Sequence, residues 1–265
     1  MTLADRTVLL TGATGGLGAE MARALTAQGA SLVLTGRRPD ALEAIAAETG
    51  GRPVLADLAE PGAAEALVRK AGPVDILIAN AALPASGLIT SFSVEEIDRA
   101  LMVNLRTPMI LGRLLGEAMA DRGEGHLVFV SSLSGKVASV GASVYSATKF
   151  GLRGFALALR EDLAPSGVGV SCVFPGFVRD AGMFADADVA DALPGYVGTS
   201  TAADVVRGVM HAIEADRAEV VIAPLQVRAG VLAATVAPGL AARVQRRLGS
   251  AAVSAALADR QRDKR

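Results

Sequence analysis

Seven short runs of Val, Ile and Leu, separated by longer alanine-rich segments, constrain the fold more than any other feature of this sequence. The runs are TVLL (7–10), SLVLT (31–35), PVLA (53–56), DILIAN (75–80), HLVFVSS (126–132), VGVSCVF (168–174) and EVVIA (219–223). Continuous apolar runs are typical of strands covered on both faces, and the helical segments between them supply right-handed crossovers. We therefore expect an α/β fold with a doubly wound, seven-stranded parallel sheet and helices on both faces.

Length and composition agree with one Rossmann-type domain of this kind. The chain has 265 residues, of which 51% are hydrophobic and 20% charged, as in compact soluble proteins. No shift in composition marks a linker. We expect residues 1–265 to form a single domain, with a core over 1–225 and a C-terminal helical extension over 226–265.

The last part of the chain is basic. Residues 228–265 carry eight Lys or Arg and two Asp, a net charge of +6, which leaves −7 for the rest of a chain whose total is −1. The uncharged stretch 229–242 contains Pro238-Gly239 and is too short to span a membrane. This tail either packs beside a substrate pocket or a second subunit, or contacts a membrane surface through its arginines. With 3% aromatic residues and no tryptophan, nucleic-acid binding is disfavoured.

The cysteine and histidine content argues against a reactive thiol and against a metal site. Cys172 is the only cysteine and lies in an apolar run, so we expect a buried structural thiol. His126 and His211 lie in unrelated segments with no Cys/His cluster, so we expect no metal site.

The N-terminal MTLADRT lacks a basic region followed by a long apolar stretch, and we expect a cytoplasmic protein.

A glycine-rich turn follows the first predicted strand. The segment TGATGGLG (11–18) leads into an amphipathic helix, and the exposed amides at such a helix start stabilise the pyrophosphate of a dinucleotide. The alternative is a tight turn without a ligand. The candidate cofactor-binding residues here are Gly12, Thr14, Gly16, Leu17 and Gly18.

The end of the second strand indicates which dinucleotide is preferred. Proteins that prefer NAD place an acidic residue there for the ribose hydroxyls, whereas this chain has Gly36-Arg37-Arg38. Gly36 leaves room for a 2′-phosphate that Arg37 and Arg38 can bind through charge-assisted hydrogen bonds. We therefore predict NADP(H) as the cofactor. The alternative is two solvated arginines and a site of dual specificity.

A tyrosine and a lysine are placed for proton transfer. Tyr145 and Lys149 are separated by four residues in a predicted helix, so they share one face. A free phenol has a pKa of about 10, and a nearby ammonium lowers it. Ser132 ends the strand HLVFVSS, at the sheet edge where open α/β folds bind ligands.

Together these segments resemble the short-chain dehydrogenase/reductase family. TGATGGLG, ANAA, the asparagine of MVNLRTP, VSS, YSATK and PGFV occur in the family's order over about residues 5–225. The resemblance implies hydride transfer between a nicotinamide and a carbonyl or alcohol carbon. Tyr145 would exchange the proton with the substrate oxygen and Ser132 would orient that oxygen. Lys149 would lower the tyrosine pKa and hold the ribose, and Asn104 would anchor a water that relays protons.

The resemblance also implies further cofactor contacts. Asp57, with Leu58 beside it, matches the position near adenine, and Asn80 matches the asparagine that steadies the central strand. The alternatives are a solvated aspartate and a helix-interior asparagine. The remaining nicotinamide contacts implied by the family pattern are Tyr145, Lys149, Pro175, Gly176 and Val178.

Three departures from the family pattern affect the site. ANAA at 79–82 replaces the common Asn-Asn-Ala-Gly, and Asp180 occupies a position where a threonine commonly contacts the nicotinamide carboxamide. Gly15-Gly16 also fits the spacing of an epimerase-like branch, although the chain length favours the shorter dehydrogenases.

Residues 180–200 correspond to the family's substrate lid. Its apolar residues predict a hydrophobic ketone or alcohol substrate, and its aspartates would discourage an anionic one if they faced inward. The resemblance further implies a homo-oligomer, dimer or tetramer, formed by helices beginning near Val94 and Tyr145. The alternative functions are a non-catalytic NADP(H)-binding sensor and an epimerase or dehydratase. The lid residues concerned are Met183, Phe184, Leu193 and Tyr196, and Asp186, Asp188 and Asp191.

Overall fold

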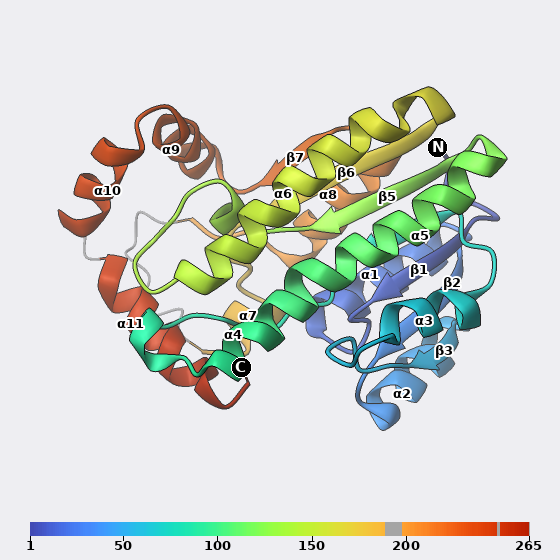
Figure 1. Ribbon diagram of the computed structural model, residues 1–265, viewed down its shortest axis with the longest axis horizontal. Coiled ribbons are helices and arrows are strands. Elements are labelled where there is room, and N and C mark those ends of the chain that lie inside the picture. Colours follow the sequence, from blue (N-terminus) through green and yellow to red (C-terminus); the bar gives the residue numbers. More distant parts are fainter. Residues whose placement is uncertain (189–197, 248–249, 265) are drawn as a thin grey trace.

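The computed structural model describes residues 1–188, 198–247 and 250–264, and it confirms the predicted sheet. Seven strands pair in parallel in the order β3-β2-β1-β4-β5-β6-β7 (Figure 1). The order reverses between β1 and β4, which gives the doubly wound topology. The strands are β1 (Thr7–Thr11), β2 (Ser31–Gly36), β3 (Arg52–Leu55), β4 (Ile76–Ala79), β5 (Gly125–Val130), β6 (Val168–Pro175) and β7 (Glu219–Ile222).

Helices cover both faces of the sheet. They are α1 (Gly16–Ala27), α2 (Pro39–Thr49), α3 (Ala63–Ala71), α4 (Val94–Leu101), α5 (Thr107–Arg122), α6 (Ser143–Leu163), α7 (Gly182–Ala185) and α8 (Ala202–Glu214). Side chains of α1, α2 and α8 pack in one core with Val8 and Leu10, while those of α3, α5 and α6 pack in another with Leu9. Because successive strand residues point to opposite faces, continuous apolar runs fill both cores.

Cys172 lies in the core beneath α3, α5 and α6 and is fully buried. Burial raises the pKa of its thiol to about 12. The predicted burial is thus confirmed, and a thiol that stays protonated is a poor nucleophile.

The tail forms the predicted helical extension. It consists of α9 (Leu225–Val236), α10 (Pro238–Arg247) and α11 (Ser250–Gln261), which gather at one end of the molecule, left in Figure 1. The Gln261 side chain donates to the Met183 carbonyl (3.0 Å), and Leu257 packs beside Phe184. Among the described residues, no helix is long and apolar enough to cross a membrane. The assignment of residues 1–265 to one domain stays a prediction.

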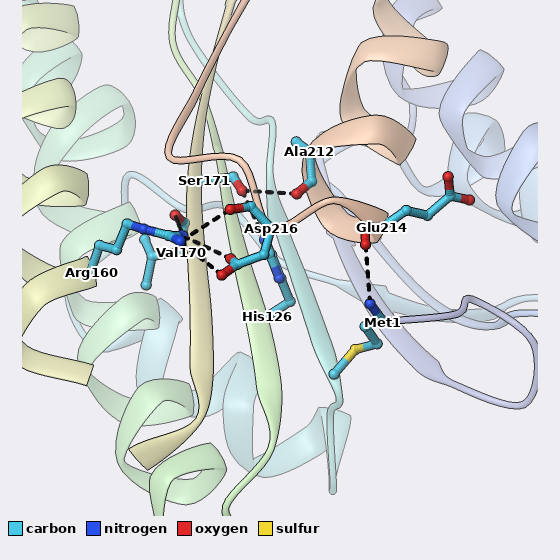
Figure 2. A network of polar contacts seen from close by, with 8 residues as sticks. All are labelled: Met1, His126, Arg160, Val170, Ser171, Ala212, Glu214 and Asp216. Atoms are coloured by element: carbon cyan, nitrogen blue, oxygen red, sulfur yellow. Dashed lines mark hydrogen bonds and ion pairs between the residues drawn. The ribbon is translucent and has the colours of Figure 1, made fainter. Parts of the chain in front are cut away.

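A polar network lies near the amino end of β5, at the sheet edge opposite to Ser132 (Figure 2), with His126 and Ser171 buried and Asp216 exposed. The Ser171 hydroxyl donates to the Ala212 carbonyl (3.3 Å) and lies 2.8 Å from His126 Nε2, which therefore carries the proton. Arg160 binds both carboxylate oxygens of Asp216 at 2.7 Å. A Cβ at Gly169 would lie 2.4 Å from His126 Nδ1, so only glycine fits beside the imidazole.

His126 predicts how stability depends on pH. Burial lowers its pKa from 6.5 to about 4, with smaller contributions from Asp216, which raises it, and from Arg160 and the N-terminal ammonium, which lower it. The unfolded state therefore binds the extra proton, and stability decreases as pH falls from 6.5 towards 4. Between pH 7 and 4.5 this single group is expected to cost about 2 kcal/mol.

Urea unfolding of the wild type and of His126→Gln across this range measures the effect, because the variant keeps a donor near Ser171 but does not titrate. The stability difference between the two proteins should change by that amount. Parallel pH profiles would show that His126 is not protonated on unfolding.

Candidate active site

A cavity of about 1000 Å³ opens at the carboxyl ends of the central strands. This is the edge at which open parallel sheets bind ligands. The cavity brings together eight of the predicted site residues, whereas the other nine lie outside its lining. The eight are Leu17, Asn80, Ser132, Tyr145, Lys149, Pro175, Gly176 and Val178.

Tyr145 and Lys149 share one face of α6, as their spacing predicts. The Lys149 Nζ lies 5.6 Å from the centroid of the Tyr145 ring and donates to the Val130 carbonyl at 3.0 Å. Ser131 Oγ donates to the Lys149 carbonyl at 3.1 Å, which fastens α6 to the end of β5. Ser132 Oγ accepts from the Ser134 amide at 3.2 Å and also hydrogen-bonds the Tyr145 phenol.

The tyrosine pKa differs from the expectation. Burial raises the pKa of Tyr145 to about 12, and the hydrogen bond with Ser132 lowers it only in part. The predicted lowering by Lys149 is absent because its ammonium lies beside the ring and binds a carbonyl of β5. Burial also lowers the pKa of Lys149 to about 8, so roughly nine-tenths of it is charged at pH 7.

Asn104 lies in a π-helical turn, Met102–Arg106, between α4 and α5. Its side chain is fully buried and binds Leu83 twice, with Oδ1 accepting from the amide (2.6 Å) and Nδ2 donating to the carbonyl (2.9 Å). Local π turns often mark functional positions. Through these two hydrogen bonds, the π-helical turn holds Leu83, in the segment that follows β4.

The glycine turn packs tightly against its own backbone. Gly12 has a φ of +69°, and a Cβ there would lie 2.9 Å from Ala81 Cα. A Cβ at Gly18 would lie 2.1 Å from the Gly12 carbonyl oxygen. Asn80 Nδ2 donates to the Thr11 carbonyl at 3.1 Å, so it ties β4 to this turn.

The start of α1 fits a dinucleotide pyrophosphate. Within the described part of the chain, Gly15 provides no side-chain cap and the first turn holds no acidic residue, whereas Ser93 of α4 and Thr201 of α8 begin capping boxes. The first amides of α1 therefore remain available to an anion. Gly16 faces the chain after β6, because a Cβ there would lie 3.2 Å from the Gly182 amide.

The two arginines after β2 differ in their contacts. Arg38 Nη2 donates to the Thr14 carbonyl at 2.5 Å, whereas Arg37 is exposed and makes no hydrogen bond within the described residues. Packing also requires a glycine at position 36, because a Cβ there would lie 2.7 Å from Thr14 Cγ2. The Arg38 guanidinium thus lies beside the glycine turn, where a 2′-phosphate is expected, and Arg37 is its exposed neighbour in the chain.

Asp57 and Leu58 follow β3 at the same edge. Asp57 Oδ1 accepts from the Ala59 amide at 3.0 Å, and its other oxygen lies 4.0 Å from Arg99. Leu58 is buried, and its carbonyl accepts from Thr107 at 3.0 Å. The structure thus gives both residues local contacts, and their predicted role near adenine stays a prediction.

Asp180 fastens both ends of the predicted lid together. Its Oδ1 accepts from the Ala202 amide at 2.8 Å, at the start of α8. Val178 bridges to Ser200, whose amide donates to the Phe177 carbonyl (2.8 Å). The carboxylate at this unusual position therefore caps a helix.

The lid and tail supply the apolar walls of the cavity. Met183 and Phe184 line it, as predicted, and Asp186 and Asp188 are exposed. Leu193, Tyr196 and Asp191 lie outside the described residues. The opposite wall comes from α9, with smaller contributions from α10 and α11. Of the two packing alternatives for the tail, the pocket-side one is therefore confirmed.

Two further residues within the motifs named above help to build the site. Thr11 Oγ1 accepts from the amides of Asn80 and Ala81, both at 3.0 Å, which joins the glycine turn to β4. Ser131, next to Ser132 at the end of the predicted strand HLVFVSS, holds the backbone of Lys149. Their positions at strand ends were the available signal, because such side chains meet at one edge of a parallel sheet.

Comparison with known proteins identifies the family. The family model described as short chain dehydrogenase matches residues 6–192. The ketoacyl reductase HetN of a Nostoc species is 38% identical over 231 residues, which are 83% of this chain and 79% of that protein. Mouse dehydrogenase/reductase SDR family member 7B is 33% identical, with 91% and 80% covered. The chain belongs to the short-chain dehydrogenase/reductase family of oxidoreductases.

Solved structures show the same fold. A short-chain dehydrogenase from Sphingobium yanoikuyae in complex with NADPH has a TM-score of 0.77 at 28% identity, with 88% of this chain and 93% of that chain covered. A bulky-bulky ketone specific alcohol dehydrogenase from Comamonas testosteroni has a TM-score of 0.72 at 25% identity, with 86% and 94% covered.

Proposed function

We propose that this oxidoreductase uses NADP(H) to move a hydride between the nicotinamide and a carbonyl or alcohol carbon of a bulky, largely apolar substrate. The observation that carries the proposal is a single cavity that holds Ser132, Tyr145 and Lys149 on one wall and apolar side chains of the lid and α9 on the others. Its volume of about 1000 Å³ is at the upper end for small-molecule sites, and the substrate would share this space with the nicotinamide.

The choice of NADP(H) is supported by charge at the glycine turn. The first amides of α1 would bind the pyrophosphate, and Arg37 and Arg38 would bind the 2′-phosphate. The related structure from Sphingobium yanoikuyae was solved in complex with NADPH. When bound, the nicotinamide supplies or accepts the hydride.

The side chains on the polar wall would handle the proton. With its pKa raised to about 12, the Tyr145 phenol keeps its proton at neutral pH and can donate it to a carbonyl oxygen during reduction. Ser132 would orient that oxygen. The Lys149 ammonium would hold the nicotinamide ribose. A proton-relaying water held at Asn104 stays a prediction, as do the homo-oligomeric assembly and cytoplasmic location.

A series of methyl ketones of increasing chain length tests the substrate class. Each methylene that enters the cavity is expected to raise kcat/KM with NADPH up to about fourfold until the space is filled. Ala234→Leu, on the cavity side of α9, should shorten the best chain length. Ala229→Leu, on the exposed side of the same helix, is the matched control.

Preference for short anionic keto acids would contradict the apolar substrate class. Tight NADPH binding without turnover of any carbonyl or alcohol would support the sensor instead.

A further inference from the structure

The exposed side of α9 is unusual for a surface helix. Leu225, Ala229, Leu232 and Val236 recur at intervals of four, three and four residues, which places them in one stripe along the helix. Leu225, Leu232 and Val236 are 77%, 68% and 80% exposed, respectively. We call these four residues the outer stripe.

The opposite side of α9 is already used. Val227, Val231 and Ala234 point into the cavity. A surface helix normally places polar residues opposite its apolar face, whereas a helix that is apolar all round is buried or meets lipid. Within the described part of the chain, nothing covers the outer stripe. Leu240 of α10 is 61% exposed but lines the cavity, so it is not part of this surface.

Charge indicates what covers this surface. From residue 220 to residue 258 the chain has no Asp or Glu but carries Arg228, Arg243, Arg246 and Arg247. The first two are exposed and make no ion pair within the described residues. Two copies meeting through this segment would bring like charges together. An anionic surface would instead be attracted by the arginines.

We propose that α9 and α10 form a docking surface for an anionic lipid bilayer. The outer stripe enters the boundary between headgroups and acyl chains, and Arg228 and Arg243 contact the anionic headgroups. The helices lie at one end of the molecule (Figure 1), so both can reach a flat surface. In this orientation α9 lies between the cavity and the membrane.

Co-sedimentation of the full chain with lipid vesicles tests the proposal. Binding is expected to vesicles of phosphatidylcholine with phosphatidylserine, to be weaker with phosphatidylcholine alone, and to decrease with salt. Leu232→Ser/Val236→Ser should lower the affinity by at least about tenfold, because it removes exposed apolar area without disturbing the core. Arg228→Gln/Arg243→Gln should lower it about fivefold for each arginine, on anionic vesicles only.

A matched control removes similar side chains elsewhere. Leu55 of β3 and Leu88, between β4 and α4, are 53% and 63% exposed, and Leu55→Ser/Leu88→Ser should leave vesicle binding unchanged. Ala229→Leu, which enlarges the outer stripe, should tighten it. Thermal unfolding of each variant checks that the fold is retained.

Absence of binding, equal binding to neutral and anionic vesicles, or an equal loss in the control would overturn the proposal. Solution mass gives a further outcome. If Leu232→Ser/Val236→Ser changes the number of subunits but not vesicle binding, the outer stripe is a contact between copies of the chain. None of these measurements requires turnover, so their result is independent of the proposed function.

Discussion

Tyr145→Phe is expected to lower kcat for carbonyl reduction by about 10³-fold, with little change in NADPH binding. The variant removes the hydroxyl that is proposed to donate the proton, and it keeps the ring that packs with Ala85, Ala100 and Val144. Steady-state kinetics give the loss of turnover, and the fluorescence of bound NADPH gives the affinity.

Two companion variants separate chemistry from packing. Ser132→Ala should lower kcat by about 10²-fold, because the substrate oxygen loses one hydrogen-bond donor. Ser143→Ala removes an exposed hydroxyl from the first turn of the same helix and should leave kcat unchanged. If Tyr145→Phe retained full turnover, the proton would have to come from another group, and the proposed chemistry would be wrong.

Replacing Arg37 and Arg38 together by alanine is expected to lower the ratio of kcat/KM for NADPH to that for NADH by about 100-fold. Two charge-assisted contacts to the 2′-phosphate would be lost, and NADH makes neither of them. The kcat/KM for NADH also reports whether the glycine turn tolerates the loss of the Arg38 bond to the Thr14 carbonyl.

Arg69→Ala is the matched control for this change. Arg69 is an exposed arginine in the last turn of α3, which leads into the opposite end of β4. Its removal should leave the cofactor ratio unchanged. If the variant lacking both Arg37 and Arg38 also kept the NADPH-to-NADH ratio of kcat/KM, the alternative of solvated arginines and dual cofactor specificity would be supported.

The sheet and its topology could be predicted because both depend on short-range patterns. Residues such as Leu9 and Leu10 of β1 are buried on opposite faces, so an unbroken apolar run signals a central parallel strand. The common face of Tyr145 and Lys149 likewise follows from helical periodicity alone.

Contacts between distant segments could not be predicted. The bond from Ala202 to Asp180 and the bond from Arg38 to Thr14 each depend on how separate elements meet. The direction of the Tyr145 pKa depends on burial by several elements and on where the Lys149 ammonium points. Helix spacing fixes a shared face, but it does not fix the partner of a flexible lysine.

The C-terminal tail shows a third limit of prediction from the sequence. Its composition left two packing alternatives open, because α9 is apolar around most of its circumference and no periodic contrast identifies the inner side. The structure resolves this by placing Val231 and Ala234 against the cavity and Leu232 and Val236 outward.

The contacts of Asp180 with Ala202 and of Val178 with Ser200 hold together the two ends of the segment between them. This segment can therefore be replaced as a unit. Because the residues that follow β6 bind those at the start of α8, the length and sequence of the segment between them can change without displacing the sheet edge that carries Pro175 and Gly176. Lengthening a loop whose ends are already held together costs little additional entropy. Related enzymes could therefore acquire new substrates by replacing this one segment, and the same two anchor points are natural junctions for grafting a lid from another family member.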